Sequence, residues 1–273
     1  MAYQAIQVEP VSPNIGAEVN NIDLNRPLSN LEVQELHDAL AEYLVLFFRD
    51  QKIEPKDLKA LGRYFGELHE HVGGAGTTAR KMEQDPIVRI LHYDETSEQI
   101  AGGEVWHTDQ SCAPIPPLGS ILYLHTVPPS GGGDTMFASM YAAYDALSER
   151  MKVYLEGLTA VQDGTRAFGA GAPISSHPII RKNPATGRKS LYITPFITTK
   201  INGLPSDESD GLIAFLGKHC QHPDFHYRFR WRPHSIAFWD NRYTQHRALW
   251  DYYPNVRSGF RVQIQETAPP LAA

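Results

Sequence analysis

The hydrophobic residues near the start of the chain follow helical spacing first and strand spacing next. Leu31, Val33, Leu36 and Leu40 fall about one helical turn apart, and Ser29 or Asn30 before them could cap the helix. The next apolar run has the length and the aromatic content of a buried strand. The elements predicted here are two short strands within 4–26, a helix over 30–43, a strand over 45–49 and a helix over 55–66.

The remaining chain alternates short apolar runs with Gly- and Pro-rich turns. Helices are predicted over 139–156 and 206–219, and loops over 72–84 and 94–103. Many short strands with few helices favour a β-sandwich or jelly roll with helical decoration over a Rossmann sheet. The predicted strands are 86–93, 119–127, 134–138, 158–163, 177–182, 189–194, 225–231, 235–239 and 257–266.

Composition and charge exclude several classes of protein. Hydrophobic residues make up 42% and charged residues 21%, which is a globular mixture and not a disordered one. A formal charge of −6 gives no basis for nucleic-acid binding. The longest apolar run, Tyr43–Phe48, is too short to cross a membrane, and no targeting segment is visible. The sequence therefore predicts a cytoplasmic protein with no nucleic-acid or membrane partner.

The cysteine and histidine counts limit the metal chemistry. Cys112 and Cys220 are too few for a disulfide framework, so both are predicted to be free thiols. Twelve histidines accompany them, so any metal site would be built from imidazole and carboxylate, a donor set that suits Fe, Zn, Cu or Ni.

Two histidines and one carboxylate form the facial site of non-haem Fe(II) oxygenases. Two of these ligands can come from an H-x-D segment, because residues i and i+2 of a strand point to the same face. The chain has three such pairs, and spacing alone does not decide between the first two. His222 and Asp224 flank a proline after a predicted helix, which indicates a surface turn. The pairs are His92/Asp94, His107/Asp109 and His222/Asp224.

The C-terminal segment adds a histidine, His246, and two arginines further along. Arg257 and Arg261 are four residues apart, so on one strand both face the same side, while Phe260, Val262 and Ile264 face the other. Adjacent guanidinium groups repel unless anions lie between them, and the arginine fork suits a carboxylate or a sulfonate. This pattern indicates an anion site near a metal.

Several motifs together resemble the taurine dioxygenase (TauD/TfdA) family. They are Trp106-His-Thr-Asp109, Gly132-Gly-Asp-Thr135, Trp239-Asp-Asn-Arg-x-Thr-Gln-His246 and Arg257-x-x-x-Arg261. N-terminal segments such as Phe47-Phe-Arg-Asp-Gln51 match as well, so the resemblance covers nearly the whole chain in order. The resemblance, and not the spacing, selects His107 over His92.

The resemblance implies a single domain over 1–273 with a double-stranded β-helix (jelly-roll) core, in a homo-oligomer. It implies Fe(II) bound by His107, Asp109 and His246, and 2-oxoglutarate bound by Thr135 and Arg257. With O2 as second cosubstrate, the enzyme would hydroxylate a C–H bond of a small anionic substrate and release succinate and CO2. Substrate contacts carried over by position are His71, Arg261 and, from aryloxyalkanoate-type members, Phe168.

Two departures argue against taurine as the substrate. Gly74 and Gly103 stand where the taurine enzyme has the two partners of the substrate's amine. The substrate is therefore expected to be a sulfonate, sulfate ester or carboxylate without an ammonium group. Two alternatives stay open at this point: a zinc hydrolase that uses the same two histidines and aspartate, and a jelly-roll binding protein without catalysis.

Overall fold

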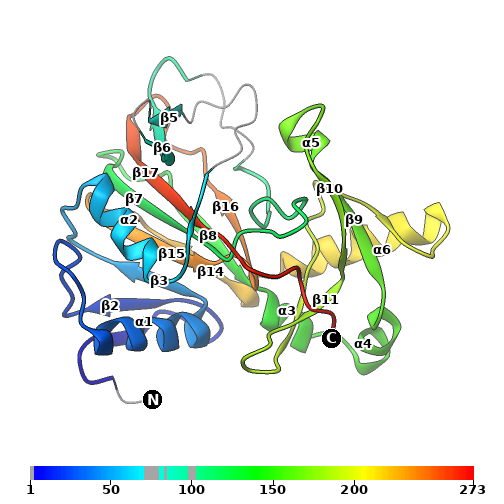
Figure 1. The fold of residues 1–273 in the computed structure, drawn as a ribbon. Helices are drawn as coiled ribbons and strands as arrows, with labels where there is room; N and C mark the ends of the chain where they lie inside the picture. Colours follow the sequence, from blue (N-terminus) through cyan, green and yellow to red (C-terminus); the bar gives the residue numbers. More distant parts are fainter. Residues whose placement is uncertain (1–2, 71–79, 83–84, 98–102) are drawn as a thin grey trace.

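A nine-stranded sheet forms the largest layer of the protein, as seen in a computed structural model that describes residues 3–70, 80–82, 85–97 and 103–273 (Figure 1). Except for the parallel pair β2 and β3, its neighbouring strands are antiparallel. In spatial order the strands are β1 (Gln7–Pro10), β2 (Ala17–Asn20), β3 (Val45–Phe48), β15 (Ser235–Asp240), β7 (Gly119–Thr126), β17 (Arg257–Ile264), β6 (Asp85–Tyr93) and β5 (Arg80–Met82), with β4 (Leu68–His69) beside β17.

A second, three-stranded sheet packs against one face of the large sheet. It consists of β14 (His226–Phe229), β8 (Thr135–Ser139) and β16 (Thr244–Ala248). Side chains of both sheets meet in one buried cluster, in which the rings of Phe47 and Phe229 stack at 4.1 Å between centroids. The prediction of a mainly β protein built from two packed sheets is confirmed.

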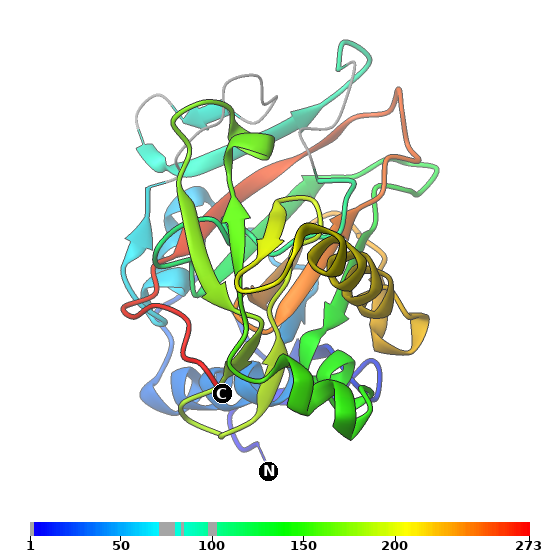
Figure 2. The ribbon, with the colours of Figure 1, turned by 90° about the vertical axis from the view of Figure 1, so that its right-hand side faces the viewer.

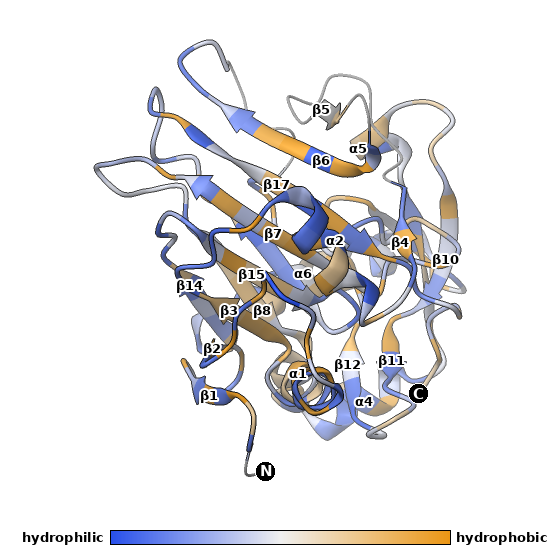
Figure 3. Cartoon of the chain, turned by 60° about the vertical axis from the view of Figure 1, so that its left-hand side comes forward, coloured by the Kyte–Doolittle hydropathy of each residue, from blue (hydrophilic) through white to orange (hydrophobic). Residues whose placement is uncertain are grey.

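Two helices cover the other face of the large sheet. α1 (Asn30–Tyr43) begins at the predicted cap, where Ser29 and Glu32 form a reciprocal capping box. α2 (Pro55–Arg63) starts at its proline and ends three residues before the predicted Gly66. Both helices pack on a core cluster that includes Leu36, Leu58, Ile121 and Val262, and Figure 3 shows hydrophobic runs along β6 and β7.

The chain between β8 and β14 forms a separate layer with its own hydrophobic cluster (Figure 2). This segment contains α3 (Met140–Asp145), α4 (Glu149–Leu155), β9 (Thr159–Asp163), α5 (Thr165–Phe168), β10 (Ile174–Pro178), β11 (Ile180–Lys182), β12 (Lys189–Leu191), β13 (Thr198–Ile201), α6 (Ser206–Cys220) and a 3-10 turn at Pro223–Phe225. It corresponds to the helical decoration that the sequence predicted.

Two predicted elements are divided in the structure. The helix over 139–156 is two helices, because Ser148 leaves the helical conformation and its hydroxyl caps α4 by accepting from the backbone N–H of Met151. The strand over 177–182 is split after Pro178, and its halves join different sheets. Ile179 between them bonds instead to the backbone of Leu158 and Tyr192.

Four of the described strands, β4, β5, β13 and β16, were not predicted. β5 lies in the segment predicted as the loop 72–84, and β13 lacks a clear alternating pattern. β16 matters most, because it carries His246. Its sequence, Thr-Gln-His-Arg-Ala, is polar, so hydrophobic periodicity could not reveal a strand that is buried beside β8.

Both cysteines are free, as predicted, and both are buried. Burial raises the pKa of the Cys112 thiol to about 11 and that of Cys220 to about 12, so both are protonated at neutral pH. None of the helices among the described residues has the length and apolar character needed to span a membrane.

Gly259 allows β17 to lie close to β7, and its replacement tests this packing. A Cβ at this position would stand 1.9 Å from the carbonyl oxygen of Tyr123. We expect Gly259→Ala to lower the free energy of unfolding by about 3 kcal/mol or more in urea denaturation, because backbone must move. Gly211→Ala in α6 is the matched control: its Cβ meets nothing within 4 Å, so a gain of about 0.5–1 kcal/mol is expected. Equal effects of the two changes would contradict this account.

Candidate metal and cosubstrate site

His107 and His246 are held side by side by their backbones. The N–H of His107 donates to the carbonyl of His246 at 3.1 Å, and the N–H of His246 donates to that of His107 at 2.9 Å. This isolated antiparallel bridge joins the segment after Trp106 to β16. Because the two residues form a directly opposed pair, their imidazole rings lie on the same side, with centroids 4.1 Å apart.

Asp109 completes a cluster of three potential metal ligands. Its Oδ1 lies 3.7 Å from Nε2 of His107 and 3.8 Å from Nε2 of His246. One ligand atom from each of the three residues falls within 4.8 Å of the others, as a single ion would require. Nδ1 of His107 donates to the carbonyl of Val105 at 2.8 Å, so Nε2 carries the lone pair that faces Asp109. The two imidazoles and one carboxylate fit a facial metal site.

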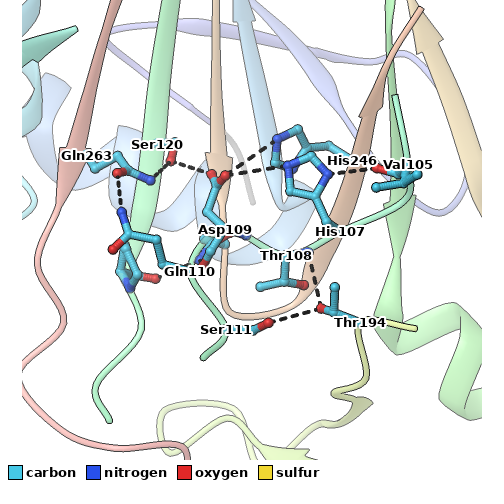
Figure 4. A network of polar contacts seen from close by, with 12 residues as sticks. Val105, His107, Thr108, Asp109, Gln110, Ser111, Ser120, Thr194, His246 and Gln263 are labelled. Atoms are coloured by element: carbon cyan, nitrogen blue, oxygen red, sulfur yellow. Dashed lines mark hydrogen bonds and ion pairs between the residues drawn. The ribbon is translucent and has the colours of Figure 1, made fainter. Parts of the chain in front are cut away.

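The backbone and side chain of Asp109 are both fixed by neighbours (Figure 4). Asn241 accepts from the backbone N–H of Asp109 at 2.8 Å and donates to its carbonyl at 2.9 Å. Ser120 donates to Oδ2 at 2.8 Å, and Nη2 of Arg261 binds the same oxygen. With Oδ2 occupied, Oδ1 is the oxygen that points to the two histidines.

Electrostatics favour the ligand forms of these residues. Burial by itself raises the pKa of Asp109, but the charge of Arg261 and the neighbouring histidines outweigh it and hold the pKa well below its usual value. Burial, together with His107, lowers the pKa of His246 far below the usual value for histidine. At neutral pH the site therefore offers an ionised carboxylate and a neutral imidazole at His246, the forms that bind a metal.

A chain of amide and hydroxyl groups continues from Asp109 to the protein surface (Figure 4). Ser120 accepts from the amide of Gln263 at 3.2 Å, and Gln263 accepts from Gln110 at 2.9 Å. Gln110 in turn contacts Nε2 of His69 at 3.2 Å. The orientation of the Asp109 carboxylate is thereby tied to the end of β4, next to the predicted substrate segment.

A cavity lies against the two histidines, and Arg257 also lines it. Arg257 is buried, its Nε donates to the carbonyl of Gly133 at 3.0 Å, and no described carboxylate forms an ion pair with it. The indole N–H of Trp231 donates to Oγ1 of Thr135 at 3.0 Å, and its ring lies 5.8 Å from the Arg257 guanidinium. The cavity is lined by Arg89, Leu91, Tyr93, Gly103, His107, Leu122, Thr135, Trp239, His246, Ala248, Leu249, Tyr252, Arg257 and Arg261.

The other predicted site residues have different positions. Arg261 lines the cavity but also binds Asp109, a contact that the sequence did not suggest. Phe168 ends α5 and is not among the residues that line this cavity. His71 and Gly74 lie outside the described residues.

The two competing H-x-D pairs lie away from the cluster. His92 and Asp94 contact each other at 3.2 Å at the partly exposed end of β6. His222 accepts from the backbone N–H of Asp224 in an exposed 3-10 turn, which confirms the prediction of a surface turn. Within the described parts of the chain, neither pair belongs to a cluster of three potential metal ligands.

Comparison with known proteins identifies the family. Residues 7–263 match the model of the taurine catabolism dioxygenase TauD, TfdA family. This chain belongs to that family. A Saccharomyces cerevisiae protein named alpha-ketoglutarate-dependent sulfonate dioxygenase is 33% identical, over 97% of this chain and 68% of its own. A Cupriavidus pinatubonensis enzyme named for 2,4-dichlorophenoxyacetate is 31% identical, over 89% and 92%. The crystal structure of a taurine dioxygenase from Burkholderia xenovorans superposes with a TM-score of 0.85 at 34% identity, covering 97% of this chain and 91% of the other.

Family membership confirms the predicted jelly-roll fold and the reaction class. The protein is a 2-oxoglutarate-dependent dioxygenase, and its His–Asp–His cluster is consistent with Fe(II). The zinc-hydrolase and binding-protein alternatives are not supported.

Several residues of the site were not predicted, and Asn241, Ser120 and Arg89 show which signals the sequence offered. Asn241 lies inside the Trp-Asp-Asn-Arg motif, so the motif itself pointed to it. Ser120 had no signal, because its contact with Asp109 depends on how β7 is placed beside β17. Arg89 interrupts the apolar run Ile87–Leu91 of β6, and this interruption was the signal that the sequence offered.

Asn241 offers a test of how the site is held together. Asn241→Ala removes both bonds to the Asp109 backbone, so we expect Co(II), a probe that resists air oxidation, to bind at least about 10-fold more weakly in calorimetric titration. Asn202→Ala is the matched control, since Asn202 bonds only Thr159 and Ser176 away from the site. An unchanged Co(II) affinity in Asn241→Ala would refute a positioning role.

Proposed function

We propose that His107, Asp109 and His246 hold one Fe(II) and that Thr135 and Arg257 bind the distal carboxylate of 2-oxoglutarate, within one dioxygenase domain over 1–273. The observation that carries the proposal is the buried guanidinium of Arg257, which has no carboxylate partner in the described part of the chain and lines the same cavity as the histidines. A buried cation is costly unless an anion or strong acceptors compensate it, and a carboxylate matches the arginine fork.

Trp231 would position the two residues that bind the distal carboxylate of 2-oxoglutarate. It fixes the hydroxyl oxygen of Thr135 by donating to it, so the Thr135 hydrogen is available for an acceptor in the cavity. Its ring also packs beside the guanidinium of Arg257. Thr135 and Arg257 can thus present their donors to one carboxylate, while the keto-acid end of the cosubstrate would extend toward the histidines.

Iron, 2-oxoglutarate and O2 would together supply the oxidising chemistry that hydroxylates a C–H bond, with release of succinate and CO2. The residues of this chain have other tasks. Ser120 and Arg261 keep Oδ2 of Asp109 occupied, so that Oδ1 faces the metal position. Trp239 and Leu122 supply apolar wall that excludes water from the cavity.

The anionic end of the substrate would lie near Arg261, the second arginine of the cavity, with His71 as an additional contact and Phe168 as part of the substrate's surroundings. Arg261 keeps a buried Nε without a partner among the described residues, although its Nη2 binds Asp109. A sulfonate, sulfate ester or carboxylate can accept from this nitrogen.

The first test is anaerobic addition of Fe(II) and 2-oxoglutarate to the purified protein. A weak charge-transfer band in the visible is expected, and Arg257→Met should weaken 2-oxoglutarate binding at least about 10-fold, because it removes the charge-assisted bonds. Arg150→Met on the exposed side of α4 serves as the control and should bind as the unchanged protein does. Absence of the band in the unchanged protein, combined with tight Zn(II) binding, would contradict the proposal.

The second test concerns taurine. Among the described residues that line the cavity, three are arginines and none is acidic, so an ammonium group would find repulsion and no counter-charge. We therefore expect succinate release with taurine to be at least about 10-fold slower than with butane-1-sulfonate, a sulfonate without the amine. Equal turnover of the two compounds would show that an amine is accepted.

A further inference from the structure

Two neighbouring strands form one wall of the cavity and place an arginine pair at its second end. β6 and β17 are antiparallel, with Tyr93 opposite Arg257, Leu91 opposite Gly259 and Arg89 opposite Arg261. Alternate residues share a face, and all of these except Gly259 line the cavity. Four residues of strand span about 13 Å, so the Arg89/Arg261 pair is separated from Arg257 by more than the length of a five-carbon dicarboxylate, which leaves room for a second anion.

The Arg89/Arg261 pair places like charges directly across from each other. Such a pair is destabilising in a sheet unless something offsets it. Burial, and next the charge of Arg261, lower the pKa of Arg89 to about 10, which leaves the guanidinium charged at neutral pH. The pair therefore brings two guanidinium groups to this end of the cavity, of which Arg261 is also ion-paired with Asp109.

Arg261 is only partly available to a substrate. Its Nη2 binds both Oδ2 of Asp109 and, at 3.0 Å, Oγ of Ser120. A substrate anion held by Arg261 alone would compete with the carboxylate that the metal site needs. Arg89 lies opposite Arg261 on the adjacent strand and lines the same cavity, so it brings a second guanidinium to this end.

We infer that Arg89 is a substrate-binding residue that, together with Arg261, selects a tetrahedral oxyanion, the –SO3 group of a sulfonate or sulfate monoester, over a carboxylate. The inference rests on the proposed function and deepens it. Two guanidinium groups on adjacent strands approach from different directions, and the three oxygens of an –SO3 group can accept from both at once. A planar carboxylate has two oxygens and is already matched by one arginine fork.

The test compares two matched ligand series in anaerobic calorimetry with Fe(II) and 2-oxoglutarate bound: linear alkanesulfonates of two to eight carbons and the carboxylates of equal chain length. The best sulfonate should bind at least 10-fold more tightly than its carboxylate. Arg89→Met, which keeps most of the side-chain bulk, should lose at least 10-fold for the sulfonate and less than threefold for the carboxylate. Arg89→Lys should restore part of the loss, because the charge returns without the fork.

The charge-transfer band and the 2-oxoglutarate affinity are the internal controls, and Arg150→Met is the matched surface variant. The charge-transfer band and the 2-oxoglutarate affinity should be unchanged in Arg89→Met, which separates a substrate role from a general loss of structure. The inference is overturned if Arg89→Met binds the sulfonate within twofold of the unchanged protein, or if both series weaken equally. It is also overturned if the unchanged protein binds Fe(II) and 2-oxoglutarate but no sulfonate, an outcome that leaves the proposed function intact. Loss of the band in the unchanged protein would instead refute the proposed function.

Discussion

The two backbone hydrogen bonds between His107 and His246 are the constraint on which the site depends. They join a segment that follows Trp106 to β16, and β16 is itself paired with β8, which carries Thr135. One pairing thus fixes both imidazoles and sets their position relative to Thr135, the proposed cosubstrate contact. Side-chain hydrogen bonds alone would hold the two imidazoles less firmly, because a side chain can change its rotamer. The register of a strand, in contrast, is specified by the whole sheet.

β17 is the second element on which the site depends, because it carries two of the arginines that line the cavity. Its Val262 and Ile264 belong to the core under α1 and α2, while Arg257 and Arg261 line the cavity, as the spacing predicted. Burial of the apolar residues holds the strand in register, so each guanidinium is placed by packing on the opposite face. Gly259 between the arginines permits the close approach of β7 that brings Ser120 to Asp109.

The sequence predicted the elements with strong periodicity and failed where a buried surface is polar. The capping box at Ser29 and the strand over 45–49 are local signals, and the structure contains both elements. Hydrophobic periodicity did not predict β16, because its residues serve the site and not the core. Spacing could not separate His107 from His92, since both have an aspartate two residues later; only motifs shared with a known family did so. The contact of Arg261 with Asp109 depends on the pairing of β17 with β7, which no short-range pattern encodes.

The net charge of −6 gave no indication of an anion site, and the structure explains why. Charges on the surface are screened over about 8–10 Å at physiological salt, whereas buried charges interact through a medium of lower polarity. Three arginines without a described acid in the cavity lining therefore dominate the local potential, whatever the total for the chain. Arg257 on one end and the Arg89/Arg261 pair on the other divide that potential into two places for anions, with the metal ligands beside the wall that joins them. The proposed function, in which two acids are bound at once and kept apart, requires such a division, and a single strand pair supplies it.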